Sequence, residues 1–305
     1  IGLAMSHEIL INVTPQETRV AMLEQGVVQE LHMERSSARG LVGNIYLGRV
    51  ARVLPGMQSA FIEIGLERAA FLHIADFWEH RQNGHGHDSK PIERILHEGQ
   101  SLLVQVIKDP IGTKGARLST QVSLAGRLLV YLPQDSHIGI SQRIEDEAER
   151  ESLREKLQLL LPAGLTGGFI IRTMAETASE REMQNDIEYL TKLWRDLNQG
   201  ALAQPAPALL HQDLSLAQRV LRDMATEETG RVVVDSRETF VRMQDFARDY
   251  TPALTERVHV PSVGQAMFSA AFSGAIAFLP TLEGASAETS RSLVWVDRQG
   301  REEGV

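Results

Sequence analysis

Two phenylalanines lie where the strand pattern points them away from a core. Residues 56–74, GMQSAFIEIGLERAAFLHI, are typical of two short strands joined by a turn that contains glycine. Side chains alternate between the two faces of a strand, so Phe61 shares a face with Glu63, and Phe71 shares one with His73. Aromatic rings on the outer face of a small barrel can stack nucleic-acid bases. The alternative is that a later segment or another domain covers both rings, as is usual for large aromatics.

Basic residues follow on the next predicted hairpin, where they could hold phosphates: Lys108, Lys114 and Arg117. The whole chain of 305 residues has a formal net charge of -9, which argues against a surface that binds polyanions everywhere. Residues 42–123, however, contain nine Lys and Arg against eight Asp and Glu. If nucleic acid binds, we expect this segment to bind it.

A second candidate site stands at the end of a short apolar strand. Arg172 and Thr173 follow GGFII, residues 167–171, and precede a predicted helix. A guanidinium fork, a hydroxyl group and backbone amides can converge on an anion at such a place. The alternative is an ordinary salt bridge at a strand end.

Other residues that could do chemistry carry weaker patterns. The stretch HRQNGHGHD offers His80, His85, His87 and Asp88 as metal ligands, but their spacing fits no helix face and favours a solvated loop. Asp235 ends an apolar strand, where a turn or capping role is more common than catalysis.

Composition limits the class of protein. The apolar and charged fractions, 43% and 23%, are those of globular proteins, and the chain contains no cysteine. Disulfides, thiolate zinc sites and a cysteine nucleophile are therefore excluded. No apolar run is long enough to span a membrane and no signal peptide is evident, so we expect a cytoplasmic protein that does not bind membranes.

The elements that must position these residues change in character along the chain. Residues 8–34 predict a β-meander, and residues 42–123 predict many short strands with glycine turns, which is typical of an OB-type barrel. Helical spacing of apolar residues then predicts an α/β region, and residues 238–250 predict a further helix. The opening meander and the strand RVVVDS could share one sheet.

Longer stretches resemble a known family. EILINVTPQETRVAMLEQGVVQELHMER, GNIYLGRVARVLPGMQSAFIEIGLERAAFLH and GTKGARLSTQVSLAGRLLVYLP are similar to the N-terminal half of the bacterial ribonucleases G and E. GGFIIRTMAE and LAQRVLRD extend the resemblance to about residue 258. The resemblance implies an endoribonuclease that binds single-stranded RNA with a 5′-monophosphate and takes part in the processing of RNA, including ribosomal RNA.

The resemblance also implies a domain plan. An S1 RNA-binding domain (42–123) and a 5′-sensor domain (124–213) would be inserted into an RNase H-like subdomain made of 5–41 and 214–258. We therefore expect an α+β multidomain fold, with an OB-type S1 β-barrel, an α/β 5′-sensor and an RNase H-like α/β subdomain.

Residue roles follow from the same resemblance. The residues that match RNA-binding positions of the S1 domain are Phe61, Phe71 and Lys114. The residues that match the 5′-phosphate sensor are Gly126, Val130, Arg172 and Thr173.

Residues 259–305 depart from the family. SGAIAFLP and RSLVWVDRQGREE instead resemble the start of a TolB/WD40-like β-propeller region, and this tail offers only Asp297 and scattered glutamates. The family's catalytic, magnesium-binding aspartates and its zinc link between subunits have no counterpart here, so we expect no catalytic or metal-binding residue in this chain. The homo-oligomer of the family is likewise not expected. Two alternatives stay open, a non-catalytic RNA-binding module and a protein-interaction fusion that carries a propeller fragment.

Overall fold

The computed structural model describes residues 7–78, 90–225 and 229–250, together with the backbone of five short strands beyond them. The chain divides into two compact units. One unit comprises Ile1–Arg39 and Leu214–Val305, and the other comprises Gly40–Asp213.

The discontinuous unit contains a five-stranded sheet in the order β15-β14-β1-β2-β3. Its strands are β1 (His7–Val13), β2 (Glu17–Glu24), β3 (Val27–Arg35), β14 (Thr229–Val234) and β15 (Val258–His259). The predicted meander is confirmed, because β1, β2 and β3 pair antiparallel in sequence. The predicted shared sheet is also confirmed, since β14 pairs parallel to β1 with Leu10 opposite Val233.

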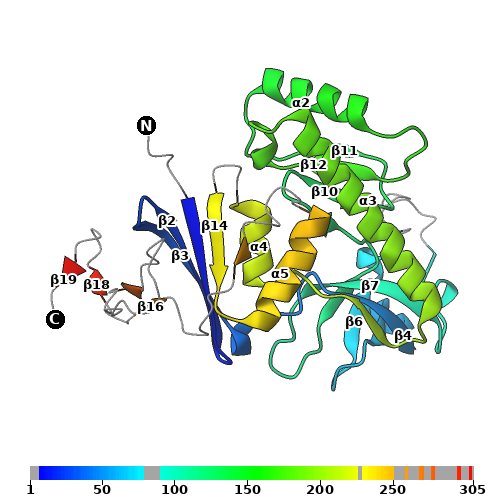
Figure 1. The fold of residues 1–305 in the computed structure, drawn as a ribbon. Coiled ribbons are helices and arrows are strands. Elements are labelled where there is room, and N and C mark those ends of the chain that lie inside the picture. The colour runs from blue at the N-terminus through cyan, green and yellow to red at the C-terminus, as the bar shows by residue number, and fades with distance from the viewer. Residues whose placement is uncertain are drawn as a thin grey trace. The chain divides into compact units, whose positions relative to one another are not determined.

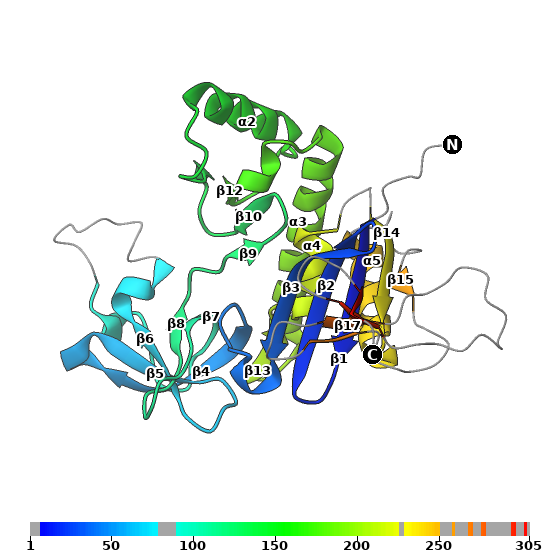
Figure 2. The same ribbon diagram turned by 90° about the vertical axis from the view of Figure 1, so that its left-hand side faces the viewer.

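Two helices, α4 (Leu216–Asp223) and α5 (Arg237–Tyr250), pack on this sheet and on each other (Figure 2). The central strands β1 and β14 have buried residues on both faces, Ile9 and Val232 among those of one face and Leu10 and Val233 among those of the other. Strands buried on both faces are typically continuous apolar runs, as are residues 232–234 (VVV) and 9–11 (ILI) at the centre of these two strands.

The continuous unit begins with a closed barrel. Its strands, in barrel order, are β4 (Ile45–Leu54), β5 (Ser59–Glu63), β6 (Ala70–His73), β8 (Arg117–Ser119) and β7 (Ser101–Lys108), with β7 pairing back to β4. Strand β4 can serve both neighbours because its first half pairs with β7 and its second half with β5. Alternate residues fill the interior, including Ile62, Leu72 and Leu118. Gly48 is required there, because a Cβ at this position would come within 2.5 Å of the Ile62 side chain.

The same unit continues into a second, four-stranded sheet in the order β11-β12-β10-β9. Its strands are β9 (Leu124–Ala125), β10 (Leu129–Leu132), β11 (Ile138–Ile140) and β12 (Gly168–Ile171). Figure 1 shows this sheet with its two helices, α2 (Glu147–Leu160) and α3 (Glu180–Ala203). Strand β13 (Ala208–His211) follows α3 and adds to the barrel strand β4.

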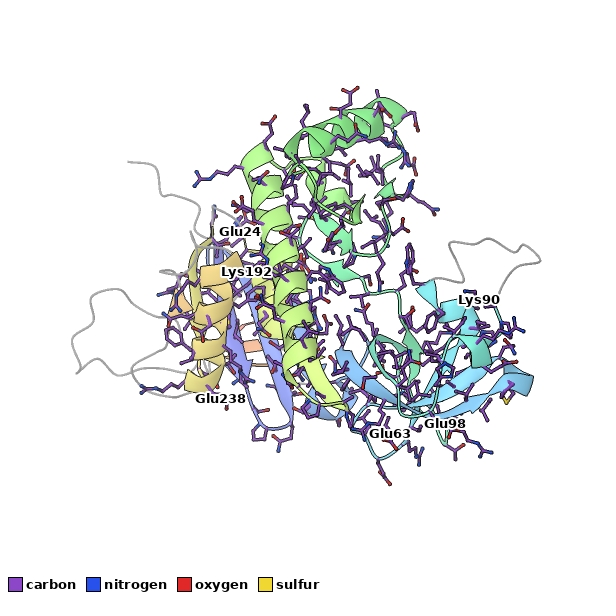
Figure 3. All side chains as sticks on the ribbon, turned by 90° about the vertical axis from the view of Figure 1, so that its right-hand side faces the viewer. Glu24, Glu63, Lys90, Glu98, Lys192 and Glu238 are labelled. Carbon is purple, nitrogen blue, oxygen red and sulfur yellow. The ribbon has the colours of Figure 1, made fainter. Side chains whose placement is uncertain are left out.

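The helices on the second sheet begin where the sequence offers caps. Asp146 accepts a hydrogen bond from the Glu149 N–H at the start of α2, and Ser179 forms a capping box with Glu182 at the start of α3. Their apolar faces share one core with the sheet, contributed by Leu157 of α2 and Ile187 of α3 among others. Figure 3 marks Lys192 on α3, and Glu63 at the end of β5 in the barrel.

The remaining elements are short. The 3-10 turns are η1 (Ser36–Ala38), η2 (Pro55–Met57), η3 (Ile74–Asp76), η4 (Ile92–Arg94) and η5 (Thr173–Ala175). The last strands, β16 (Phe268–Ala270), β17 (Ile276–Phe278), β18 (Val294–Val296) and β19 (Glu302–Glu303), form an antiparallel sheet. The propeller resemblance of the tail stays a prediction.

The predicted fold class is therefore confirmed at its coarse level, as a mixed α+β protein with a closed five-stranded barrel, which is consistent with the OB type. Among the described residues, no helix is both long enough and apolar enough to cross a membrane.

Candidate nucleic-acid interface

The two phenylalanines lie side by side on the outside of the barrel. Phe61 and Phe71 are direct register partners across β5 and β6. Their ring centroids are 6.3 Å apart at an interplanar angle of 65°, an edge-to-face arrangement. The side chain of Phe61 remains 38% exposed, and Phe71 is half-buried. The strand pattern thus predicted their shared face correctly, and Phe61 is not covered.

Register extends this pair into a row across all five barrel strands. Arg52 of β4 lies opposite Phe61, Arg117 of β8 lies opposite Phe71, and Lys108 of β7 lies opposite Arg117. We call Arg52, Phe61, Phe71, Arg117 and Lys108 the register row. Every member is exposed or half-buried. Two rings flanked by cations on both sides have the chemistry to stack bases and to contact phosphates.

One carboxylate fixes a cation of the register row. The Arg117 guanidinium donates to Asp76 Oδ2 at 2.8 Å. Asp76 is itself anchored, because its backbone carbonyl accepts hydrogen bonds from the Ser119 hydroxyl and the Thr120 N–H. The contact holds the guanidinium at the edge of the aromatic pair.

Lys114 lies outside the register row. It ends the tight turn 111–114 before β8, where Ile111 and Lys114 form an isolated antiparallel bridge, and its side chain is exposed. The turn is held from outside by Arg68, whose guanidinium donates to the Gly112 carbonyl. The structure therefore brings Phe61 and Phe71 together and leaves Lys114 on a neighbouring turn.

The second sheet brings most of the predicted sensor residues together. Strands β10 and β12 pair antiparallel, with Val130 opposite Ile170. Arg172, at the end of β12, therefore lies beside the turn that precedes β10. The Arg172 N–H donates to the Leu128 carbonyl at 2.8 Å, and its guanidinium donates to the Gly126 carbonyl. Thr173 follows directly and is half-buried.

The helix expected after Thr173 is confirmed, but it does not follow Thr173 directly. Thr173 begins only the 3-10 turn η5, which ends at Ala175, and the long helix α3 begins at Glu180. Ser179 is the reason, because its side chain and Glu182 form the capping box that starts α3. A helix N-terminus therefore does not serve as the anion site here, and the guanidinium is the group that could.

A buried carboxylate that the sequence reading did not single out closes the turn before β10. Asp186 of α3 is only 4% exposed and accepts hydrogen bonds from the N–H groups of Arg127, Leu128 and Leu129, at 3.1, 2.9 and 2.8 Å. A Cβ at Gly126 would come within 2.4 Å of Asp186 Oδ2, so only glycine fits. A signal was present, since Asp186 follows the buried Met183 by three positions and thus interrupts an apolar helix face.

Charges near the start of α3 shift one pKa. Partial burial raises the pKa of Glu182, but hydrogen bonds from Ser179 and the nearby charges of Arg127 and Lys156 outweigh it, so the net pKa is lowered. Arg127 approaches Glu182 at 3.6 Å. Glu182 is therefore a charged helix cap at neutral pH.

The remaining carboxylate candidate has a structural role. Asp235 accepts hydrogen bonds from the Val13 N–H at 2.8 Å and the Asn12 side-chain amide at 2.6 Å. Both donors belong to the end of β1, so Asp235 joins two strand ends instead of filling the turn or capping role that we expected. His80, His85, His87, Asp88 and Asp297 lie outside the described residues.

Magnesium needs several oxygen ligands, usually carboxylates. Within the described ranges, no three His, Asp or Glu side chains gather so that they could hold a metal ion. Asp186 and Asp235 are both engaged with backbone amides. The described residues therefore do not fit a magnesium site, and the expectation that metal ligands lie elsewhere in the family stays a prediction.

Comparison with known proteins identifies related sequences. Residues 123–272 match the Ribonuclease E/G family, so the match runs beyond residue 258, where the resemblance noted from the sequence ends. The chain is 47% identical to Ribonuclease G of Escherichia coli (strain K12) over 259 residues, which is 83% of this chain and 53% of that protein. It is 44% identical to Ribonuclease G of Haemophilus influenzae over 266 residues, 86% of this chain and 54% of that protein.

Ribonuclease E of Nostoc sp. is more distant, at 37% identity over 246 residues, which cover 80% of this chain and 35% of that protein. The chain thus spans about half the length of the Ribonuclease G proteins that it matches.

Proposed function

From the Ribonuclease E/G family domain that residues 123–272 carry, we propose that residues 7–250 are the RNA-recognition part of a ribonuclease G-like endoribonuclease. In this proposal residues 42–123 are an S1 domain, residues 124–213 a 5′-sensor, and the discontinuous sheet an RNase H-like subdomain. The substrate is single-stranded RNA with a 5′-monophosphate, and the process is cytoplasmic maturation of RNA, including ribosomal RNA.

The observation that carries the proposal is the register row. Its two rings offer faces on which successive bases can stack, independent of base identity. Its three cations, Arg52, Arg117 and Lys108, flank the rings on both sides and can contact phosphates. Lys114, exposed on the adjacent turn, adds a further cation. A stacking surface with flanking cations binds unpaired RNA better than a duplex, whose bases are already stacked.

The sensor supplies the preference for one end of the RNA. The Arg172 guanidinium is held at the Gly126 carbonyl, with Thr173 beside it and Val130 on the adjoining strand. An arginine fork suits a terminal phosphate dianion, because it can donate two hydrogen bonds at once. Val130 and Gly126 then line the terminal nucleotide.

Magnesium, in this proposal, belongs to the cleavage step, where it would activate water and neutralise phosphate charge. The described residues do not fit it, so recognition is what the proposal assigns to them. Whether the chain acts in cleavage or only in binding is decided by incubating it with 5′-monophosphorylated RNA and Mg²⁺. Specific cleavage that EDTA abolishes supports the endoribonuclease, and retained RNA without cleavage supports the non-catalytic module.

The central test is a binding titration by fluorescence anisotropy. Three RNAs of the same length are compared: a single strand with a 5′-monophosphate, the same strand with a 5′-hydroxyl, and a blunt duplex. We expect the affinity to fall in that order. Equal affinity for the single strand and the duplex would contradict the stacking role of the register row, and equal affinity for the two single strands would contradict the sensor.

A further inference from the structure

The turn before β10 has no backbone donors to spare. The N–H groups of Arg127, Leu128 and Leu129 donate to the Asp186 carboxylate, and the Gly126 N–H donates to the Leu129 carbonyl at 2.8 Å. Successive backbone N–H groups that converge in this way form an anion-binding nest. Here the protein's own carboxylate occupies the nest, so an RNA phosphate cannot use those amides.

The opposite side of the turn presents an acceptor. The Gly126 carbonyl accepts from the Arg172 guanidinium, and the Leu128 carbonyl accepts from the Arg172 N–H. The turn therefore contacts α3 through its donors and Arg172 through its acceptors. Asp186 fixes the first set of contacts, and the position of the second set depends on it.

We infer that Asp186 is the positioning residue of the 5′-phosphate site, which orients Arg172 by closing the 126–129 turn and leaves phosphate recognition to the arginine fork. The inference rests on the proposed sensor and extends it to a residue on α3. The buried carboxylate itself does not touch RNA.

Two substitutions separate geometry from charge. Asp186→Ala leaves three N–H groups, two of them in buried contacts, without this acceptor. Asp186→Asn removes the charge but keeps an oxygen that can serve Leu128 and Leu129, while its amide group meets the Arg127 N–H as a second donor. If the carboxylate positions the turn, the affinity ratio between 5′-monophosphate and 5′-hydroxyl RNA falls about tenfold in Asp186→Ala, similar to the loss of an outer-shell partner at a metal site. It falls less in Asp186→Asn.

A third substitution reaches the same contact from the other side. Gly126→Ala places a Cβ 2.4 Å from Asp186 Oδ2 and pushes the turn off an unchanged carboxylate. It too lowers the ratio. Both changes act through one contact, so their effects should not add. The affinity ratio of the double variant Gly126→Ala/Asp186→Ala is expected to be no lower than the lower of the two ratios measured for the single variants.

The matched control is Asp235→Ala. Asp235 also accepts from a backbone N–H, that of Val13, but in the other unit. This variant is expected to lower the melting temperature and leave the ratio unchanged. Affinity for 5′-hydroxyl RNA, which reports on the register row, verifies that each Asp186 variant is folded where RNA binds.

The outcomes are distinct. The inference is overturned if the unsubstituted chain prefers 5′-monophosphate RNA but the affinity ratio is unchanged or increased in Asp186→Asn and in Gly126→Ala. The proposed sensor would still be supported by that result. An unsubstituted chain without preference overturns the sensor, and the inference with it. A reduced ratio in the Asp186 variants and in Gly126→Ala, with the control unaffected, supports both.

Discussion

The barrel and the second sheet present functional side chains in two different ways. The register row is assembled from one residue on each of five strands, and the ladder hydrogen bonds of the closed barrel hold the backbone of each member. The sensor turn instead depends on a single buried carboxylate for three of its N–H groups. Substitution of one member of the register row should remove one contact with RNA. Substitution of Asp186 should change the conformation of the whole 126–129 turn.

The largest effect expected tests the independence of the row. Phe61→Ala and Phe71→Ala should each weaken single-stranded RNA binding by about 1–3 kcal/mol, since each removes a stacking surface. Both proteins should remain folded, because neither ring belongs to the barrel core. Anisotropy titrations measure the affinity and circular dichroism measures the fold.

Leu66→Ala serves as the control for the aromatic variants. Leu66 is a 41% exposed apolar side chain of the barrel outside the register row, so its loss should leave the affinity unchanged. If the phenylalanine and leucine variants weaken binding equally, the row has no special role.

Arg172→Lys tests the sensor in the same terms. An ammonium keeps the charge but cannot reproduce the planar fork, so the preference for 5′-monophosphate RNA should fall by about 1.5 kcal/mol. Affinity for 5′-hydroxyl RNA should not change. A competition assay with the two RNAs measures the difference, and a preference that survives intact would mean that charge alone suffices.

Ser179→Ala should destabilise the second sheet and its helix α3 and leave the stability of the barrel unchanged. It removes the capping box of α3 and should cost about 1 kcal/mol of unfolding free energy. Hydrogen exchange would show faster opening at the start of α3 than in β4–β8. Uniform acceleration throughout the continuous unit would show that the two regions open together.

Lys114→Ala should have a smaller and less specific effect. Loss of one exposed cation should weaken binding to all single-stranded sequences and reduce the slope of log affinity against log salt by about 0.7. Titrations at several salt concentrations measure that slope. An unchanged slope would remove Lys114 from the RNA contacts.

The smallest effect expected concerns the pH at which His211 on β13 and Glu182 on α3 each stop contributing to stability. Burial lowers the pKa of His211 on β13, and the nearby Asp213 opposes this only in part. A lowered folded pKa means that the unfolded chain binds the extra proton first, so this contribution to stability is present above about pH 6.5 and declines below it. The pKa of Glu182 is lowered in the folded chain, so the stability that Glu182 contributes is lost only below about pH 4.5. His211→Gln should therefore flatten the decline in melting temperature between pH 7 and pH 5 only.

The sequence predicted which face of a strand each side chain lies on, but not which residues lie opposite each other on neighbouring strands. Period-two alternation is local, so it placed Phe61 and Phe71 on one face. The inclusion of Arg52 in the row depends on a register shift between Val50 and Arg52 in β4, and that of Lys108 on a shift after Val106. Such irregularities follow from barrel closure and leave little trace in the local pattern.

The sensor was harder to predict for a similar reason. Arg172 and Thr173 stand beside an obvious apolar strand, but the turn they face is held by a carboxylate 57 residues further along the chain from Leu129. A tertiary contact therefore decides the shape of this turn.

The parallel pairing of β1 with β14 has a consequence for the order of folding. Asn12 and Asp235, joined by a hydrogen bond at the ends of these strands, are 223 residues apart. A ribosome adds roughly 5–20 residues per second, so β1 waits about 10–45 s for its partner strand to be made. During that interval one edge of β1 has no strand to pair with and is open to wrong partners. The barrel and the second sheet can fold within it, which makes the discontinuous sheet the last part of residues 7–250 to be completed during synthesis.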